Sequence, residues 1–261
     1  MTDTFAPSDG LRAAYEQRAA IQYATVPVLP DARLDRKFER VSALLAAQLP
    51  CRSYLDAGCG DGRYLAALAA MPGRPERVSA TDISERILEV AQATSGHAGL
   101  EVETARANLE SLPFPDGSFD LVLCTQVIEH LLDPELGLRE LTRVLAPGGR
   151  AILTTDNRRN LVTKTLNLPR TIAVHALRLR HRREPVSYPH RDFTRGHVLA
   201  LLERARLVAE HIETFRFSLR APLDHPAAVR ALNAVERRVP RSGLGDIVAV
   251  VARKPGPDEL R

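Results

Sequence analysis

The chain has 261 residues, of which 44% are hydrophobic and 26% charged, with a formal net charge of +4. This composition is typical of a folded globular protein and excludes a disordered or collagen-like chain. No apolar run approaches the ~20 residues that a transmembrane helix needs, and the first twenty residues lack the apolar stretch of a secretory signal. Since the three cysteines form no CxxC pair, we expect a cytoplasmic protein with neither a disulfide framework nor a metal site.

Strand-like and helix-like segments alternate along the chain from about residue 40. After a helical pattern over 38–48, strands are predicted at 53–57, 77–82, 100–105, 119–124 and 150–155, with helices at 61–71, 84–94 and 134–145 between them. Such alternation implies right-handed crossovers and a parallel, doubly wound sheet. A helix capped by Thr194 and two last strands, at 208–217 and 247–253, are expected to complete it with an antiparallel pair.

A glycine-rich turn between the first strand and the next helix is the sharpest motif, Tyr-Leu-Asp-Ala-Gly-Cys-Gly-Asp-Gly-Arg-Tyr at 54–64. Its glycines let a ligand approach the backbone closely. A nicotinamide dinucleotide fingerprint would read G-x-G-x-x-G, but here the third glycine comes one position early. Asp61 also stands where a pyrophosphate would approach, which disfavours an anion. A cationic or zwitterionic nucleoside fits better, and Asp56 would suit its ammonium group.

Polar side chains also follow the second and third predicted strands. Asp82 ends the second strand, where a carboxylate can accept hydrogen bonds from both hydroxyls of a ribose. Asn108 follows the third strand and could bind the amino edge of an adenine. Because the carboxyl ends of parallel strands meet at one edge of a sheet, the three motifs together predict a nucleoside site there.

These motifs resemble the class I S-adenosylmethionine-dependent methyltransferases. Besides LDAGCGDGRY at 55–64, the segments LPFPDGSFDLVLCTQVIEHL (112–131) and RVLAPGGRAILTT (143–155) resemble signatures of that family. The resemblance covers about 40–156 and, more weakly, 186–253, where it favours the small-molecule branch that includes quinone-biosynthesis methyltransferases. It implies an α/β fold with a doubly wound, mostly parallel seven-stranded Rossmann-like sheet and an antiparallel edge strand.

The resemblance also assigns residues to the cofactor S-adenosylmethionine. Asp56 would bind the methionine amino group, Asp82 the ribose, and Ile83 would pack on the adenine. Asn108 stands where the family commonly has an acid, and its amide can still accept from the adenine amino group. The full set of residues assigned to the cofactor is Tyr23, Asp56, Gly58, Cys59, Gly60, Asp82, Ile83, Asn108, Leu109, Thr125, Gln126 and Val127.

For function, the resemblance implies methyl transfer to a small organic acceptor, with oxygen favoured over carbon and nitrogen. A general base is needed only where the acceptor must lose a proton, and neutral imidazole suits this role. His190 ranks first and His130 second, with His175, Tyr188 and Asp192 as further candidates; a loop histidine bonded to backbone is the alternative. Two rival functions stay open: a cyclase or decarboxylase of the same fold, and a non-catalytic cofactor-binding protein.

The expected organisation is an N-terminal helical cap at 1–40, the cofactor-binding core at 41–156, an inserted lid at 157–190 and the rest of the sheet domain at 191–261. Residues 157–183 carry eight cations and no acid, interleaved with apolar residues. This pattern favours amphipathic helices over the acceptor pocket, with a membrane contact or a solvated basic face as alternatives. Nucleic acid is not expected as a partner, because no aromatic residues accompany these cations. The sequence gives no oligomeric state.

Overall fold

The computed structural model describes residues 35–159, 190–215 and 245–260, together with Glu16 and positions 227, 230, 231 and 234. Most of the predicted cap at 1–40 and of the predicted lid at 157–190 therefore lies outside the described residues. The same is true of Tyr23, His175 and Tyr188, three of the side chains that the sequence singled out.

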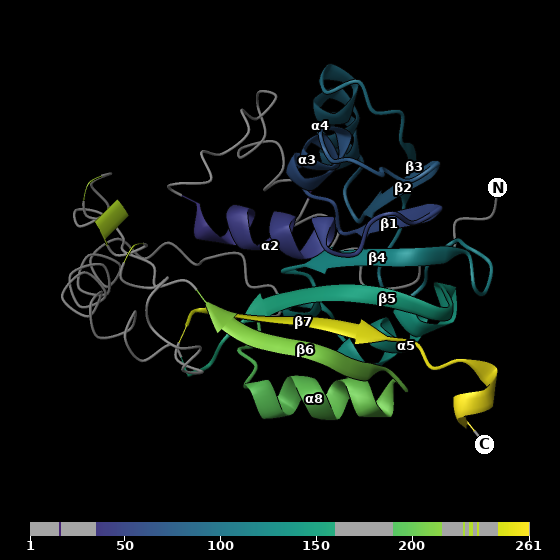
Figure 1. The fold of residues 1–261 in the computed structure, drawn as a ribbon, viewed down its shortest axis with the longest axis vertical. Coiled ribbons are helices and arrows are strands. Elements are labelled where there is room, and N and C mark those ends of the chain that lie inside the picture. Colours follow the sequence, from purple (N-terminus) through teal and green to yellow (C-terminus); the bar gives the residue numbers. More distant parts are fainter. Residues whose placement is uncertain are drawn as a thin grey trace.

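A seven-stranded sheet forms the centre of the described fold, in the order β3-β2-β1-β4-β5-β7-β6 (Figure 1). The strands are β1 Ser53–Ala57, β2 Arg77–Asp82, β3 Glu103–Arg106, β4 Phe119–Thr125, β5 Leu145–Asp156, β6 Val208–Phe215 and β7 Ile247–Arg253. Strands β1 to β5 are parallel, whereas β7 pairs antiparallel with both β5 and β6. The predicted sheet is confirmed, and its reversed strand β7 lies between β5 and the edge strand β6.

Helices cover both faces of this sheet. They are α2 Arg36–Ala46, α3 Arg63–Ala69 and α4 Glu85–His97 on one face, and α5 Pro134–Val144 and α8 Arg195–Arg204 on the other (Figure 1). Successive strand residues face opposite sides, so Tyr54 belongs to the core under α2 and α3 while Leu55 belongs to the core under α5 and α8. The predicted cap of α8 is confirmed, since the Thr194 hydroxyl accepts from the His197 N–H. No helix among the described residues is long and apolar enough to cross a membrane.

From the sequence, Pro147-Gly-Gly149 is expected to be the turn that ends the helix predicted at 134–145, because glycine and proline commonly follow a helix, and the structure differs. Helix α5 already ends at Val144, and β5 begins directly at Leu145 and runs through the Pro-Gly-Gly segment. The β4–β5 register shifts between Phe119 and Leu121, and Gly148 has a φ of +79°. Glycine and proline here shape an irregular strand start rather than a helix terminus, because such residues are tolerated where the ladder is interrupted.

The order of the strands determines where a ligand can bind. The chain passes from β1 to β2 on one side and later returns to β4 on the other, so the connections leave β1 and β4 in opposite directions. In open α/β sheets this switch point opens a crevice at the carboxyl ends of the strands. The glycine turn after β1, Asp82 in β2 and Thr125 in β4 all lie at that edge.

Candidate functional site

A cavity of about 330 Å³ lies at the carboxyl ends of β1, β2 and β4. Of the residues assigned to the nucleoside ligand, those that line it are Gly58, Cys59, Gly60, Asp82, Ile83, Asn108, Leu109, Thr125, Gln126 and Val127. The fold therefore brings together four separate chain segments that the sequence had assigned to one site. Asp56 is fully buried and is not part of the lining, and Tyr23 lies outside the described residues.

The glycine turn forms one wall of the cavity. The N–H groups of Gly58 and Cys59 both donate to the Thr81 carbonyl, at 2.8 and 2.9 Å, which ties the turn to β2. Gly58 and Gly60 have φ values of +80° and +53°, at which a side chain is strained. A Cβ at Gly58 would lie 2.4 Å from Val127 Cγ2, whereas a Cβ at Gly60 would meet no described atom within 4 Å. The backbone at Gly60 is thus open to a ligand.

Gly62 and Gly60 form a matched pair for testing what the turn requires. A Cβ on Gly62, with a φ of +75°, would lie 2.9 Å from both Cα and O of Ala91 in α4, so strain and a backbone clash add up. We expect Gly62→Ala to lower the free energy of unfolding by about 2–4 kcal/mol. Gly60→Ala carries only the backbone strain and should cost about 1 kcal/mol. Urea denaturation of both variants measures this, and equal losses would contradict the role assigned to the α3–α4 contact.

Asp82 presents a buried carboxylate to the cavity. Its Oδ2 accepts from the Gly60 N–H at 3.2 Å, and its Oδ1 accepts from the Ser84 N–H at 3.1 Å. Burial raises the pKa of Asp82 to about 6, and the backbone donors oppose this rise. At neutral pH the carboxylate is ionised, and its remaining lone pairs can accept further hydrogen bonds, as the ribose prediction requires.

Asp56, in β1, has no exposed surface, and neither carboxylate oxygen has a hydrogen-bond partner among the described residues. Burial, together with the negative charges of Asp82 and Asp61, raises the pKa of Asp56 to about 8. A buried carboxyl without a donor is costly to keep charged. The arrangement therefore favours a cationic group near Asp56, because such a group would stabilise its ionised form.

The Asn108 amide lines the cavity after β3 and is held by Glu110. Its Oδ1 accepts from the Glu110 N–H at 3.2 Å, and its Nδ2 donates to the Glu110 carboxylate at 3.0 Å. The carbonyl oxygen has a second lone pair and the amide nitrogen a second hydrogen. The predicted contact with an adenine amino group is therefore compatible with these bonds.

Glu129 is a buried carboxyl that sequence reasoning missed. It is 1% exposed, and burial raises its pKa to about 8. One oxygen accepts from Gln126 Nε2 at 2.8 Å, and the other accepts from the Thr155 hydroxyl at 2.9 Å. Gln126 adopts a φ of +56°, so this cavity residue is held in an uncommon conformation by Glu129 and, through Thr155, by β5. The sequence signal that could have identified Glu129 is an acid that follows the buried strand β4 closely and precedes His130.

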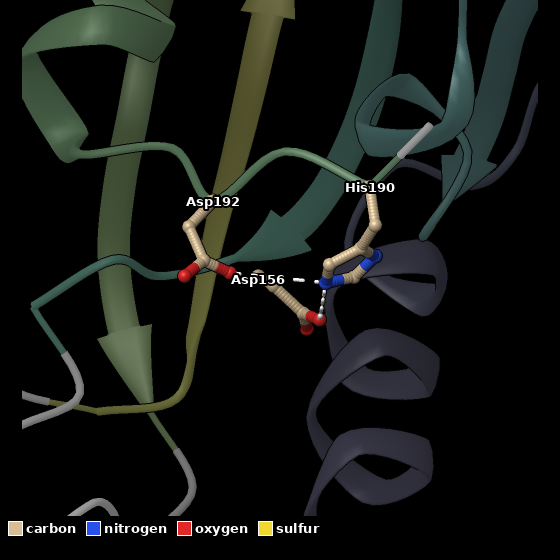
Figure 2. A group of neighbouring side chains, drawn as sticks. All are labelled: Asp156, His190 and Asp192. Carbon is tan, nitrogen blue, oxygen red and sulfur yellow. Dashed lines mark ion pairs between the residues drawn. The ribbon is translucent and has the colours of Figure 1, made fainter. Parts of the chain in front are cut away.

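The two predicted bases, His130 and His190, lie side by side, with ring centroids 5.2 Å apart. His130 lines the cavity, whereas His190 does not. Figure 2 shows His190 turned toward two carboxylates, with Nε2 at 3.4 Å from Asp156 Oδ2 and 3.8 Å from Asp192 Oδ1. Of the two candidate bases, His130 therefore has direct access to the cavity, although the sequence ranked it second.

Charged residues around the glycine turn modify the electrostatic argument made from the sequence. Both carboxylate oxygens of Asp61 accept hydrogen bonds from the Arg63 guanidinium, with Nε at 2.9 and 3.1 Å. Asp61 is therefore less repulsive to an anion than an isolated acid would be. Lys37, in the first turn of α2, also lines the cavity and was not predicted, since nothing in its local sequence separates it from a solvated lysine.

Comparison with known proteins identifies this arrangement. Residues 55–153 match the family model described as a methyltransferase domain, and this range runs from within β1 to within β5 and contains β2, β3 and β4. Residues 55–153 are therefore similar to a methyltransferase domain, and the relatives that share this segment are named as S-adenosylmethionine-dependent methyltransferases, whose cofactor is S-adenosylmethionine.

Curated relatives support the same class. A probable S-adenosylmethionine-dependent methyltransferase of Mycobacterium tuberculosis is 42% identical over 123 residues, which cover 47% of this chain and 42% of that protein. A ubiquinone biosynthesis O-methyltransferase of Xanthomonas euvesicatoria is 33% identical over 123 residues, covering 47% and 49%. A ubiquinone/menaquinone biosynthesis C-methyltransferase of Enterobacter is 35% identical over 104 residues, covering 39% and 41%. The match spans less than half the length of each of these relatives.

Solved structures show the same fold at low sequence identity. One is a complex of the Haloferax volcanii Trm112 methyltransferase activator with a protein assigned as a methyltransferase; the TM-score is 0.62, the identity 17%, and the coverage 94% of this chain and 97% of that one. An S-adenosylmethionine-dependent methyltransferase of Mesorhizobium loti has a TM-score of 0.54 and 22% identity, with coverage of 83% and 99%.

Proposed function

We propose that the protein transfers a methyl group from S-adenosylmethionine to a small organic acceptor, with oxygen favoured over carbon and nitrogen. The observation that carries the proposal is one cavity that joins the open glycine turn, the Asp82 carboxylate and His130. The cofactor supplies an activated methyl group on a sulfonium, so the protein's main task is to bind and orient the reactants. Relatives named for O-methylation and C-methylation in quinone biosynthesis support a small acceptor.

The residues around the cavity fit the cofactor. Asp56 is a fully buried carboxyl whose oxygens have no hydrogen-bond partner among the described residues, and it suits the cationic amino group of the methionine part. Asp82 would accept hydrogen bonds from the ribose, and Asn108 from the adenine amino group. Gly60 leaves the backbone accessible where a side chain would otherwise stand. The remaining lining residues predicted for the cofactor would provide packing around it.

On the acceptor side we propose that His130 takes the proton of a hydroxyl, where the acceptor has one to lose. A neutral imidazole at the cavity wall is suited to this transfer near neutral pH. The hydrogen bond between buried Glu129 and half-buried Gln126 positions the segment that precedes His130. Positioning of the acceptor against the cofactor supplies the rest of the acceleration, up to ~7–11 kcal/mol for well-oriented reactants.

We also propose the organisation and location expected from the sequence. A cap and a basic lid would enclose the acceptor on the open side of the cavity, where the described cations Lys37 and Arg63 are part of the lining. A cytoplasmic location is supported by Cys51, Cys59 and Cys124, all of which are free thiols.

One experiment separates methyl transfer from the rival functions. The protein is incubated with S-adenosylmethionine and a panel of phenolic, enolic and amine acceptors, and products are detected by intact mass. An acceptor mass increase of 14 Da with formation of S-adenosylhomocysteine is expected. Conversion without that increase would favour a cyclase or decarboxylase. Cofactor binding with no turnover across the panel would favour a non-catalytic binding protein.

Asp82 provides a direct test of cofactor binding. We expect Asp82→Ala to weaken S-adenosylhomocysteine binding by about 1–3 kcal/mol, roughly 5- to 150-fold, because hydrogen bonds to a charged group are lost. Isothermal titration calorimetry measures the Kd, and Asp116→Asn, at a carboxyl with an 80% exposed side chain, is the control. An unchanged Kd in Asp82→Ala would remove this residue from the site. NAD should leave the melting temperature of the wild type unchanged, while S-adenosylhomocysteine should raise it.

A further inference from the structure

Three potential metal ligands meet at the carboxyl end of β5, beside the cavity but outside its lining. They are Asp156, which ends β5, and His190 and Asp192, which lie in the segment before α8 (Figure 2). One ligand atom from each lies within 4.8 Å of the other two. This cluster differs from the expectation of no metal site, because Asp156 is far from the other two residues in the chain and the three form no recognised ligand spacing.

The three atoms converge as ligands of one ion do. His190 Nε2 lies 3.4 Å from Asp156 Oδ2 and 3.8 Å from Asp192 Oδ1. Ligand atoms bound at about 2.0–2.2 Å to one zinc-sized ion stand about 3–3.5 Å apart, so only small side-chain rotations are needed. Both carboxylates approach the same imidazole nitrogen rather than one on each ring nitrogen. This arrangement differs from a histidine that is oriented through one nitrogen and reacts through the other.

Backbone bonds hold the two ligand-bearing segments together. The Phe193 N–H donates to the Asp156 carbonyl at 3.1 Å, and the Arg158 N–H donates back to the Phe193 carbonyl at 2.8 Å. The Arg191 N–H donates to the Glu129 carbonyl at 3.0 Å, while its guanidinium is directed to the carbonyls of Leu131 and Leu132. The ligands are therefore placed by a fixed backbone pairing, which is the preorganisation that a metal site needs.

We propose that Asp156, His190 and Asp192 bind a divalent transition-metal ion. One imidazole and two carboxylates favour Mn²⁺ or Zn²⁺ over Mg²⁺ and Ca²⁺, which prefer oxygen ligands alone. The ligand side chains are 37–46% exposed, so the ion would keep coordination positions open to water or to another ligand. An open site of this kind binds substrate oxygen, in contrast to a closed structural site.

The position of the site indicates what the ion does. His190 lies beside His130, which lines the cavity, so an ion held by His190 would be next to the cavity wall. This role rests on the proposed function: the ion would make a bound acceptor oxygen more acidic, and His130 would accept its proton. The oxygen would then form a bond to the methyl carbon of the cofactor while the bond from that carbon to sulfur breaks, which leaves S-adenosylhomocysteine. Binding of the ion itself does not depend on this function.

Metal binding is tested with the full chain after dialysis against a chelator. Electron paramagnetic resonance of Mn²⁺ titrated into the protein should show one site, from which Zn²⁺ displaces Mn²⁺ at lower concentration than Mg²⁺ does. Asp156→Asn, Asp192→Asn and His190→Gln should each weaken Mn²⁺ binding at least tenfold. The matched controls Asp116→Asn and His97→Gln, at exposed positions elsewhere, should bind Mn²⁺ as the wild type does.

Folding of each variant is checked by its affinity for S-adenosylhomocysteine or, if the wild type does not bind it, by its melting temperature. Absence of a Mn²⁺ site in the wild type, or full retention of binding in the three ligand variants, would overturn the proposal. Failure of the wild type to bind S-adenosylhomocysteine while Mn²⁺ still binds at this site would instead count against the proposed function alone.

Discussion

Replacing Asp56 by asparagine should stabilise the cofactor-free protein at pH 8 and weaken its binding of S-adenosylmethionine. The stability effect follows from the raised pKa, about 8 against an ordinary value of 3.8. At pH values between 3.8 and about 8, the folded protein holds a proton on Asp56 that the unfolded chain has released. Stability therefore falls as pH rises through this window, by at most about 1.4 kcal/mol per pH unit. Asparagine cannot ionise and removes this loss.

The measurement is urea denaturation of both proteins from pH 5 to pH 8.5 without cofactor. Between pH 6 and pH 8 the stability difference in favour of Asp56→Asn should grow by about 2 kcal/mol. Asp116→Asn makes the same change at an exposed carboxyl, so its stability should follow the wild-type curve. Parallel curves for Asp56→Asn and wild type would show that the carboxyl is already ionised at pH 6.

The same variant should lose cofactor affinity because a neutral amide replaces the partner of a cation. A hydrogen bond to a charged group contributes about 1.5–3 kcal/mol, so the Kd for S-adenosylhomocysteine should rise about 10- to 150-fold. A gain in stability together with a loss of binding distinguishes a functional carboxyl from a structural one. Unchanged affinity would leave Asp56 as a buried acid with no ligand.

Much of the cofactor side of the site could be predicted from sequence because it is local. The glycine turn and Asp82 are placed by a strand, a turn and the end of the next strand, so their chain order determines their position in space. The strand bounds 53–57, 77–82 and 247–253 were predicted as the structure has them. β7 is a nearly continuous apolar run, whereas β1 and β2 contain polar residues and are marked by the turns that flank them.

The rest of the site depends on contacts between distant segments. Glu129 takes its role from Thr155, which is brought beside it by the parallel pairing of β4 and β5. Asp156 meets His190 only because Phe193 pairs with Asn157, and no sequence spacing reports that bridge. The prediction that Pro147-Gly-Gly149 ends a helix was wrong for a related reason. The conformation of this segment is set by the neighbouring strand β4 and not by the helix that precedes it.

The positions of the two histidines relative to the cavity also depend on contacts between distant segments. His190 precedes a predicted helix at the acceptor edge, which favoured it as base, but the sequence does not reveal the two carboxylates at its Nε2. His130 follows β4 closely, and the sequence does not reveal that it lines the cavity. Both positions are loop residues whose environment comes from tertiary contacts.

His130→Ala should lower the rate of methyl transfer to a hydroxyl acceptor by about 10²–10⁴, the contribution of a positioned general base. The side chain lines the cavity, and its removal leaves the acceptor without a described imidazole on the cavity wall. Single-turnover rates measure the loss, and the limb of the rate–pH profile that reports the base should disappear. The affinity for S-adenosylhomocysteine should change only a few-fold, and His97→Ala, at the exposed end of α4, should keep the wild-type rate.

The companion variant His190→Ala tests whether His190 acts as a metal ligand or as the general base. If His190 is a metal ligand, His190→Ala should lose activity together with Mn²⁺ binding, and His130→Ala should lose activity while still binding Mn²⁺. A loss below tenfold in His130→Ala would leave positioning alone as the source of acceleration. If the wild-type protein binds no Mn²⁺ and His190→Ala lowers the rate of methyl transfer by 10²–10⁴, His190 would be the favoured base. Asp156 and Asp192 would then hold its ring.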